Sequence, residues 1–293
     1  MNRDTKSEGP VASEQSARSI EGWTGFQAPS ESREERKIAS VANAMRLIEK
    51  LDTLGEAGVS ELSRELGVSK PAVDRLLVTL LDSGFVEQNA ESRRYRLSIR
   101  FIAIANGIRP RTKLPEIARP YLLDLNDRFH ETVHLGVLSN GNVVYAETVP
   151  SRQMFRIEAK PGTTLPAYCT ALGKAVLAHR DPDEVEQYLR TVVPVSYTRY
   201  TTTDFGALRQ QIESVRTDGF ALDLGEILEE VCCLAAPVLD SKGRALAALS
   251  VTAPRSLFLR KREELEQAVP AAARQLTADA IASDATVDGI EPR

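Results

Sequence analysis

The chain has 293 residues, and 37 Lys and Arg against 41 Asp and Glu give it a formal net charge of −4. Apolar residues make up 42% and charged residues 27% of it, which is typical of a globular protein. At this length we expect two or more domains. No apolar run is long enough to span a bilayer, and the N-terminus lacks the apolar core of a secretory signal. Three cysteines make no disulfide framework, so we expect a cytoplasmic protein without membrane contact.

The charges are unevenly distributed. Residues 1–35 carry 4 basic and 7 acidic residues, residues 36–114 carry 14 and 9, and residues 115–293 carry 19 and 25. A net charge of +5 in the second segment, beside −6 in the third, predicts that only the second meets a polyanion. The first segment is rich in Ser, Glu, Gly, Pro and Gln without apolar periodicity, and we expect a disordered tail there.

Residues 36–98 have the pattern of a small DNA-binding domain. Apolar residues recur at helical spacing over 38–51, a short helix capped by Ser60 follows, and Ser69 caps a third helix that runs to residue 83. Two short strands around a polar turn complete the segment. Helix, short helix, glycine turn, third helix and hairpin are the order of a winged helix-turn-helix, whose third helix enters the major groove.

The expected DNA contacts lie on the third helix and on the hairpin, the wing. They are Ser69, Lys70, Pro71, Ala72, Arg75, Arg93, Arg94 and Tyr95. Residues 93–113 contain seven basic and no acidic residues, which favours phosphate contact by Arg93, Arg94 and Arg96. Arg109, Arg111 and Lys113 are as well explained by a solvated linker, which we place at residues 99–114 as a helix.

Residues 115–285 alternate between helix and hairpin patterns. The Asn140-Gly141 pair predicts a tight hairpin turn. The expected helices are 115–129, 170–180, 182–191, 204–218 and 257–284, the last kinked at Pro270, and the expected strands are 132–138, 143–149, 154–159, 231–239 and 245–253. This mixture predicts an antiparallel sheet covered by helices. Residues 286–293 form a C-terminal tail.

One motif suggests a different function. The sequence from His130 through Glu131 to His134 matches the zinc motif H-E-x-x-H, which would make the protein a metallohydrolase. That chemistry requires a helix, whereas the residues from Thr132 onwards alternate as a strand, where i and i+4 lie about 13 Å apart. We therefore expect no metal site.

Other chemical signals are weak. Cys169, Cys232 and Cys233 have apolar or small neighbours, and no nucleophile elbow or phosphate loop is present. The backbone N–H groups at the start of the helix near residue 171 are suited to a small anion. Asp223 and Glu226, after a predicted strand, are either a loop acid pair or pocket hydrogen-bonding groups. We expect no catalytic residue and no cofactor.

Several segments together resemble the IclR family of bacterial regulators. They are IASVANAMRLIEKL, LSRELGVSKPAVDRLLVTLLDSGFVEQ and YRLS in the first domain, and ETVHLGVL, LPAYCTALGKAVLA, VRTDGFALD and CCLAAPVLDSKGRALAALSVTAP in the second. The resemblance covers about residues 38–284. It implies an α+β chain in which a linker helix joins the winged helix-turn-helix to a GAF-like effector-binding and oligomerisation domain.

The resemblance also implies a function. The family regulates transcription as dimers or dimers of dimers on palindromic operators, with a small organic acid as effector. Carried over by position, the effector pocket comprises Met154, Ile157, Leu165, Ala171, Leu172, Asp223, Cys233, Ser250 and Thr252. LPAYCTALGKAVLA is most similar to the subgroup that controls protocatechuate and β-ketoadipate catabolism, which implies a catabolic operon and an aromatic or dicarboxylic acid.

The sequence departs from the family pattern in three places. Pro71-Ala72 replaces the usual Ser-Thr of the recognition helix, Asp74 replaces an aromatic residue or His, and Glu230 replaces a Gly before the cysteine strand. These changes put the operator contacts and one pocket edge in question. A remaining alternative is a ligand-sensing module that acts through protein partners, which dispensability of residues 36–100 would favour.

Overall fold

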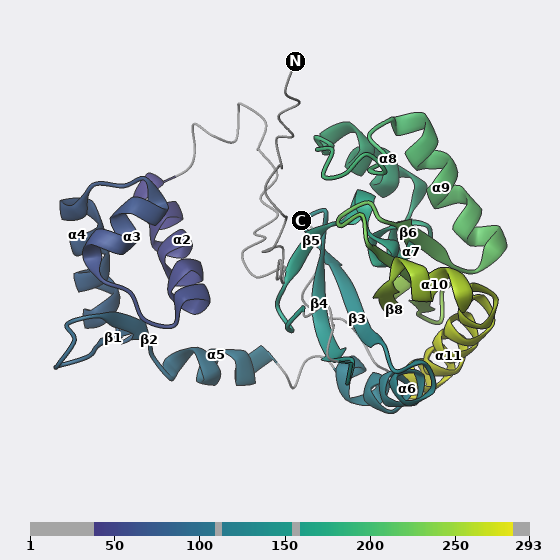
Figure 1. The fold of residues 1–293 in the computed structure, drawn as a ribbon, viewed down its shortest axis with the longest axis horizontal. Coiled ribbons are helices and arrows are strands. Elements are labelled where there is room, and N and C mark those ends of the chain that lie inside the picture. The colour runs from purple at the N-terminus through teal and green to yellow at the C-terminus, as the bar shows by residue number, and fades with distance from the viewer. Residues whose placement is uncertain (1–37, 109–112, 154–158, 284–293) are drawn as a thin grey trace, which may run out of the picture.

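The computed structural model describes residues 38–108, 113–153 and 159–283. Its first part consists of three helices and a two-stranded antiparallel hairpin (Figure 1). In chain order these are α2 (Ala39–Leu54), α3 (Val59–Leu66), α4 (Lys70–Asp82), β1 (Val86–Gln88) and β2 (Tyr95–Leu97). The predicted winged helix-turn-helix is confirmed.

A small apolar core holds this domain together. One face of each helix is apolar and packs inward; the buried side chains include Leu47, Leu51, Leu62, Leu66, Val73, Leu77, Val86 and Tyr95. Gly67 ends α3 in the left-handed conformation, with φ of 66°, and its N–H donates to the carbonyl of Ser63. Because glycine adopts positive φ without strain, α3 and α4 can meet at a steep angle.

Two helix starts differ from the expectation. α3 begins after Gly58, not at Ser60, so the predicted Ser60 cap is wrong. Ser69 does occupy the N-cap of α4, but its side chain accepts no hydrogen bond from the helix. The linker helix, α5 (Arg100–Ile108), leads away from the hairpin (Figure 1).

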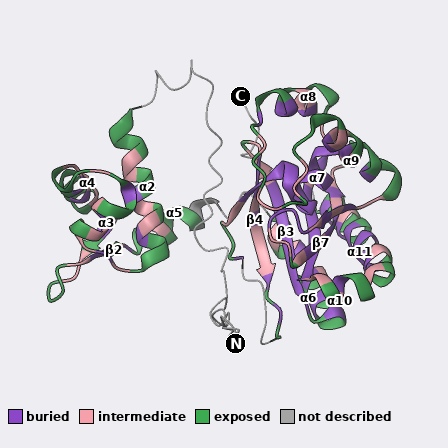
Figure 2. Cartoon of the chain, turned by 45° about the horizontal axis from the view of Figure 1, so that its top comes forward, coloured by how far each residue is buried: buried purple, intermediate pink, exposed green. Residues whose placement is uncertain are grey.

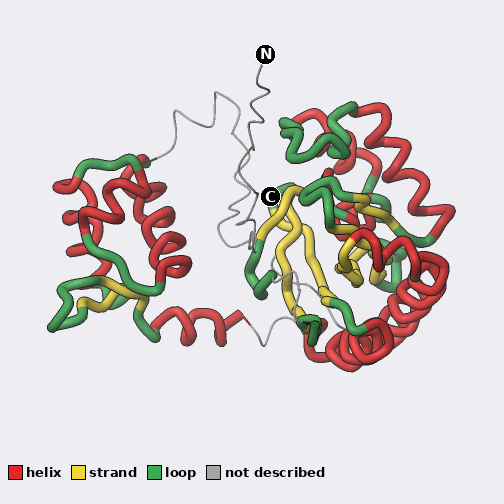
Figure 3. The backbone as a smooth tube through the Cα atoms, in the orientation of Figure 1, coloured by secondary structure: helices red, strands yellow, loops and turns green. Residues whose placement is uncertain are grey.

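The second part is a six-stranded antiparallel sheet with helices on both faces (Figure 3). The strand order is β5-β4-β3-β8-β7-β6. The strands are β3 (Thr132–Ser139), β4 (Asn142–Val149), β5 (Thr164–Pro166), β6 (Ala221–Leu224), β7 (Val231–Leu239) and β8 (Ala245–Pro254). The predicted sheet type is therefore correct, and the short strands β5 and β6 form its edges.

Each face of the sheet has its own core (Figure 2). On one face lie η2 (Ala167–Cys169), α7 (Ala171–Leu177), α8 (Pro182–Thr191) and α9 (Phe205–Asp218). On the other lie α6 (Leu114–Phe129), α10 (Arg255–Arg260) and α11 (Arg262–Ala282). Because alternate strand residues point to opposite faces, β7 and β8 contribute to both cores.

The β3–β4 hairpin turns at the predicted pair. Asn140 and Gly141 have φ of 49° and 76°, the positive values that a primed two-residue turn requires. The register between the two strands shifts between Leu135 and Gly136.

The end of the chain differs from the prediction of one helix kinked at Pro270. The helix is interrupted at Lys261, whose N–H bonds the carbonyls of Leu257 and Phe258, and α11 then runs on past Pro270. The ammonium of Lys261 lies 3.4 Å from the carbonyl oxygen of Phe129, which ties this break to the end of α6.

Several predictions fall outside the described residues: the two tails, most of the strand at 154–159, and linker residues Arg109 and Arg111. In the part of the chain that is described, no helix is both long and apolar enough to cross a bilayer.

Candidate functional site

The outer face of α4 carries unpaired positive charge. Val73 and Leu77 point into the core, whereas Lys70, Pro71 and Arg75 are exposed. The Lys70 and Arg75 side chains have no partner among the described residues. Ser69 is exposed at the N-cap, and Ala72 is half-buried. Asp74 is exposed beside Arg75, so the acid sits on the same outer surface of α4.

The three wing residues expected to contact DNA have different surroundings in the structure. Arg93 lies in the turn with φ of 57°, exposed and without a side-chain partner in the described structure. Arg94 instead donates to Glu61 Oε2 and to the Glu56 carbonyl, each at 2.7 Å. Tyr95 is only 8% exposed and packs in the core, so its assignment to the DNA surface is corrected.

Arg96 and Arg100, the next two basic residues of the acid-free stretch, contact the domain itself. Arg96 pairs with Glu87 at 3.1 Å. Arg100 donates to the Ser83 carbonyl, and its guanidinium lies 4.7 Å from the centre of the Phe85 ring. These arginines stabilise the hairpin and the start of α5, which leaves Arg93 as the wing arginine whose side chain has no partner among the described residues.

The HETVH segment does not form the helical turn that a zinc motif requires. α6 ends at Phe129, His130 adopts the left-handed conformation with φ of 61°, and β3 begins at Thr132. His134 is buried in that strand and its ring stacks on Tyr145. Within the described residues, no three His, Cys, Asp or Glu side chains are grouped so that they could hold a metal ion.

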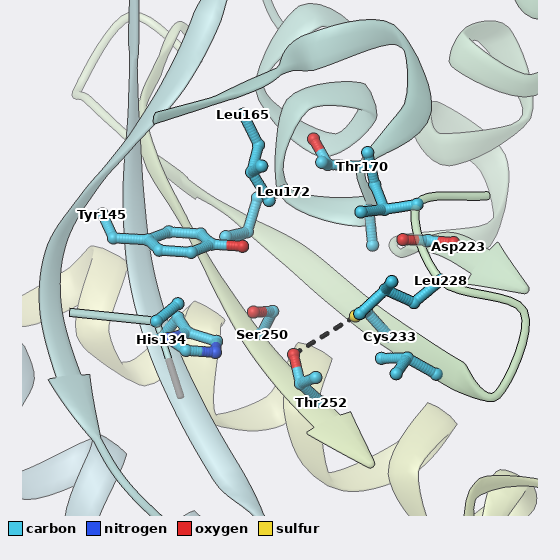
Figure 4. A pocket seen from close by; sticks show the side chains of 14 residues that line it. His134, Tyr145, Leu165, Thr170, Leu172, Asp223, Leu228, Cys233, Ser250 and Thr252 are labelled. Atoms are coloured by element: carbon cyan, nitrogen blue, oxygen red, sulfur yellow. Dashed lines mark hydrogen bonds between the residues drawn. The ribbon is translucent and has the colours of Figure 1, made fainter. Parts of the chain in front are cut away.

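A pocket lies between the sheet and the start of α7 (Figure 4). It encloses about 470 Å³ of space free of protein atoms, part of it open to solvent. Its lining comprises His134, Tyr145, Ala159, Leu165, Thr170, Ala171, Leu172, Asp223, Ile227, Leu228, Val231, Cys233, Ser250 and Thr252. Apolar walls with a few convergent polar groups are typical of small-molecule sites.

Seven of the nine residues expected for the effector pocket line this one space. They come from β5, α7, β6, β7 and β8: Leu165, Ala171, Leu172, Asp223, Cys233, Ser250 and Thr252. Met154 and Ile157 lie outside the described residues. Asp223 belongs to β6 itself and does not follow the strand, which corrects its expected placement. Glu230, the departure at the pocket edge, is exposed and is not among the lining residues.

The aromatic side of the pocket was not expected from the sequence. The His134 and Tyr145 rings stack at 4.6 Å between centroids, with an interplanar angle of 9°. His134 Nδ1 lies 3.1 Å from Thr148 Oγ1. Burial lowers the pKa of His134 to about 4, so its ring is neutral at pH 7. The strand alternation of HETVHLGVL could have indicated that His134 shares a face with residues of the neighbouring strand.

The start of α7 offers backbone donors. Thr170 caps the helix, because its Oγ1 accepts the N–H of Gly173 at 3.1 Å. The N–H groups of Ala171 and Leu172 belong to the first turn, where a helix provides no acceptor of its own. An added Cβ on Gly173 would lie 2.2 Å from the Ala167 carbonyl oxygen, so only glycine permits this close approach.

The two cysteine positions near the pocket are not reactive thiols. Burial raises the pKa of the Cys233 thiol well above its usual value, and Asp223 raises it further. Its Sγ lies 3.2 Å from Thr252 Oγ1. Burial likewise raises the pKa of Cys232 to about 11. Because the thiolate is the nucleophilic form, neither group is suited to covalent catalysis.

Buried charges lie beside the pocket. Asp223 Oδ1 accepts the N–H groups of Gly225 at 3.1 Å and Glu226 at 2.7 Å. The Lys174 ammonium pairs with Glu226 and donates to Gln211 Oε1 at 3.1 Å. This pair joins α7 to the loop between β6 and β7 and to α9.

Comparison with known proteins gives a consistent assignment. The model of the IclR helix-turn-helix domain matches residues 40–90, and the model of the bacterial transcriptional regulator IclR C-terminal domain matches residues 109–278. The HTH-type transcriptional regulator KdgR of Escherichia coli is 33% identical over 242 residues, covering 82% of this chain and 92% of KdgR.

Solved structures agree. An IclR transcriptional regulator from Alicyclobacillus acidocaldarius superimposes with a TM-score of 0.68 at 26% identity, covering 83% of this chain and 98% of the other. An IclR homologue from Microbacterium hydrocarbonoxydans, complexed with 4-hydroxybenzoate, shares the fold, with a TM-score of 0.69 at 23% identity over 83% and 99% of the chains. This chain therefore belongs to the IclR family of bacterial transcriptional regulators, with a helix-turn-helix and a C-terminal effector-binding domain.

Proposed function

We propose that residues 36–98 bind a palindromic operator as double-stranded DNA, with α4 in the major groove and the wing on the phosphates. The observation that carries this proposal is the set of exposed, unpaired cations Lys70, Arg75 and Arg93 on one small domain. Ser69, Pro71 and Ala72 present the helix start to the bases, whereas Arg94 holds the wing in place. An operator-binding regulator works where the DNA is, in the cytoplasm.

We further propose that a small organic acid is the effector and binds in the pocket of residues 115–285. The support is chemical: first-turn N–H groups of α7 and the hydroxyls of Ser250 and Thr252 suit a carboxylate, and Leu165 and Leu172 suit a carbon skeleton. These residues would bind the acid, and none of them is proposed to be catalytic. The regulated genes would be a catabolic operon for such an acid.

A second copy of the chain is the proposed partner, as a homodimer or a dimer of dimers. Apolar side chains are exposed along α2 and around the start of α5: Ile38, Val41, Met45, Ile99 and Ile102, each more than half exposed. Exposed apolar side chains such as these would be removed from water if a second copy covered them. Two copies paired through these helices would place two α4 helices on the two halves of a palindrome.

Fluorescence anisotropy on DNA from upstream of the gene tests the proposal, with 4-hydroxybenzoate as the first acid probe. We expect binding at low salt and a changed affinity when the acid is added. Ser250→Ala should weaken the response to the acid and leave acid-free DNA binding intact. Equal loss of both would indicate a folding defect, and no DNA binding by the folded wild-type protein would contradict the proposal.

A further inference from the structure

The described lining of the pocket contains no positively charged side chain. Among its described lining residues there is no Lys or Arg, and His134, the one basic group, is neutral at pH 7 because burial lowers its pKa. A bound carboxylate would therefore be held by neutral donors: backbone N–H groups, Ser250, Thr252 and the Tyr145 hydroxyl. The described site is thus limited in how much negative charge it can accommodate.

One acid nevertheless lines this pocket. Asp223 is 4% exposed, and its Oδ1 is occupied by the N–H groups of Gly225 and Glu226. Its other oxygen, Oδ2, has no hydrogen-bond partner among the described residues. Figure 4 shows the Asp223 carboxyl at the edge of the same space as Thr170, Leu228 and Cys233.

The charges behind the pocket do not neutralise Asp223. The Lys174 side chain is 2% exposed and its ammonium is already paired with Glu226. With Asp223 ionised, these three buried groups carry a net charge of −1; with Asp223 protonated they carry none. The titratable groups that face Asp223 from the surrounding elements are Lys174 of α7, Glu226 of the loop, Cys232 and Cys233 of β7, Cys169 of η2, Tyr145 of β4 and, across the pocket, His134 of β3.

We propose that the effector is a singly charged acid, that its binding takes up one proton onto Asp223, and that the Asp223 Oδ2–H group then donates a hydrogen bond to the ligand. This inference rests on the proposed function of the pocket and specifies the chemistry of its ligand. The proton comes from solvent and remains on Asp223, so no covalent bond to the ligand forms or breaks.

The ionisation of Asp223 agrees with this geometry. Burial raises its pKa to about 7, and Glu226 raises it while Lys174 and the two N–H donors lower it. A ligand carboxylate nearby adds a second negative charge, which raises the pKa further in the complex. Above pH 7 each unit of pH should then weaken binding of the acid about tenfold, because one proton is taken up per ligand.

A dicarboxylic acid fits this pocket poorly. The subgroup resemblance implied an aromatic or a dicarboxylic acid, and the described lining favours an acid with a single carboxylate. A second carboxylate would lie against Leu165, Ile227 or Leu228, with no cation in the described lining to meet it. Burying an unpaired carboxylate is strongly unfavourable. The pocket should therefore distinguish a monocarboxylate from the dicarboxylate of the same skeleton.

Matched pairs of acids test this distinction on the full-length protein by calorimetry at pH 6. The probes are 4-hydroxybenzoate with terephthalate, hexanoate with adipate, and gluconate with glucarate. We expect the monocarboxylate to bind at least about tenfold more tightly in every pair that binds. A dicarboxylate that binds as tightly as its partner overturns the inference but leaves the proposed function intact. Binding of none of the six acids overturns both.

Proton uptake is measured on the wild-type protein and needs no variant. Titrations of the best monocarboxylate in phosphate and in Tris at pH 8 should show close to one proton taken up, and close to none at pH 6. Asp223→Asn, whose amide can also donate, should retain at pH 8 the affinity that it has at pH 6. Absence of proton uptake by the wild-type protein at pH 8, when the acid binds, overturns the inference.

Discussion

Arg94 and Glu61 form an ion pair of 2.7 Å that ties the wing to α3. The same guanidinium donates to the backbone carbonyl of Glu56, so it joins the hairpin to the loop before α3 as well. Arg93, its neighbour in the turn, has no such contact in the described structure. Two adjacent arginines thus differ in their contacts. We expect their alanine variants to differ in the salt dependence of DNA binding and in stability.

Arg93→Ala should reduce the salt dependence of operator binding. Each phosphate contact releases condensed counterions, so losing one lowers the slope of log affinity against log salt by about 0.9. The measurement is anisotropy on operator DNA over a series of salt concentrations. A slope identical to that of the wild-type protein would place Arg93 away from the phosphates.

Arg94→Ala is the matched control. Its ion pair is partly exposed, so its loss should destabilise the winged helix by only about 0.5–1 kcal/mol. We expect a small decrease in the urea midpoint of this domain and a salt slope closer to that of the wild-type protein than the Arg93→Ala slope. A larger loss of slope in Arg94→Ala than in Arg93→Ala would indicate that Arg94, and not Arg93, contacts the phosphates.

Lys174→Met should strongly destabilise the effector-binding domain. The change leaves the Glu226 carboxylate buried without its partner, and breaking a buried pair typically costs about 3–5 kcal/mol. Urea unfolding followed by circular dichroism measures the loss. The double variant Lys174→Met/Glu226→Leu removes both charges and should recover most of the stability; a double variant no more stable than the single one would contradict this explanation.

Glu131→Gln should change how stability depends on pH. Burial raises the pKa of Glu131 to about 7, against the opposing effect of Lys261. An acid whose pKa is raised in the folded state destabilises the fold once it ionises, so this contribution grows from about pH 4.5 to pH 7 and is constant above. The variant should match the wild type near pH 4 and exceed it by about 2–3 kcal/mol at pH 8. Equal stabilities at both pH values would show that Glu131 is solvated.

Two glycine substitutions should differ in severity. In Gly173→Ala the new Cβ meets backbone atoms of Ala167, which cannot move aside. In Gly136→Ala it meets the side chains of Val143 at 2.7 Å and Leu172 at 2.9 Å, which can adjust in part. Overpacking of this second kind costs about 1–3 kcal/mol, and Gly173→Ala should cost more. Thermal unfolding ranks them, and equal melting temperatures would contradict the ranking.

Met45→Glu should weaken self-association, because it places a charge in the exposed apolar face of α2. Asp52→Ala, at an exposed polar position of the same helix, serves as control. Sedimentation velocity should show more monomer for Met45→Glu only. An unchanged monomer fraction in Met45→Glu would show that the interface between copies lies away from this face of α2.

Local patterns predicted the helices and hairpins well, because spacing, glycine stops and the Asn140-Gly141 turn act over a few residues. Long-range pairings could not be predicted in this way. Lys174 and Glu226 are 52 positions apart, and no local pattern shows that one buried charge meets the other. Likewise, the strand pattern around Tyr95 shows that alternate residues share a face, but not that this face is the core.

The pocket illustrates the same limit. Seven of its lining residues, from β5, α7, β6, β7 and β8, were expected from resemblance, whereas the stack of His134 on Tyr145 depends on a register shift within the hairpin. The break at Lys261 was missed because it depends on contacts with the end of α6, far away in the sequence.

The central claim, a regulator that binds its own operator, is tested most directly by anisotropy of labelled DNA from upstream of the gene. The account predicts saturable binding at about 50 mM salt, weaker binding as salt rises towards about 200 mM, and little displacement by an equal amount of unrelated DNA. Equal affinity for the upstream and unrelated DNA, or no binding at 50 mM salt, would contradict it.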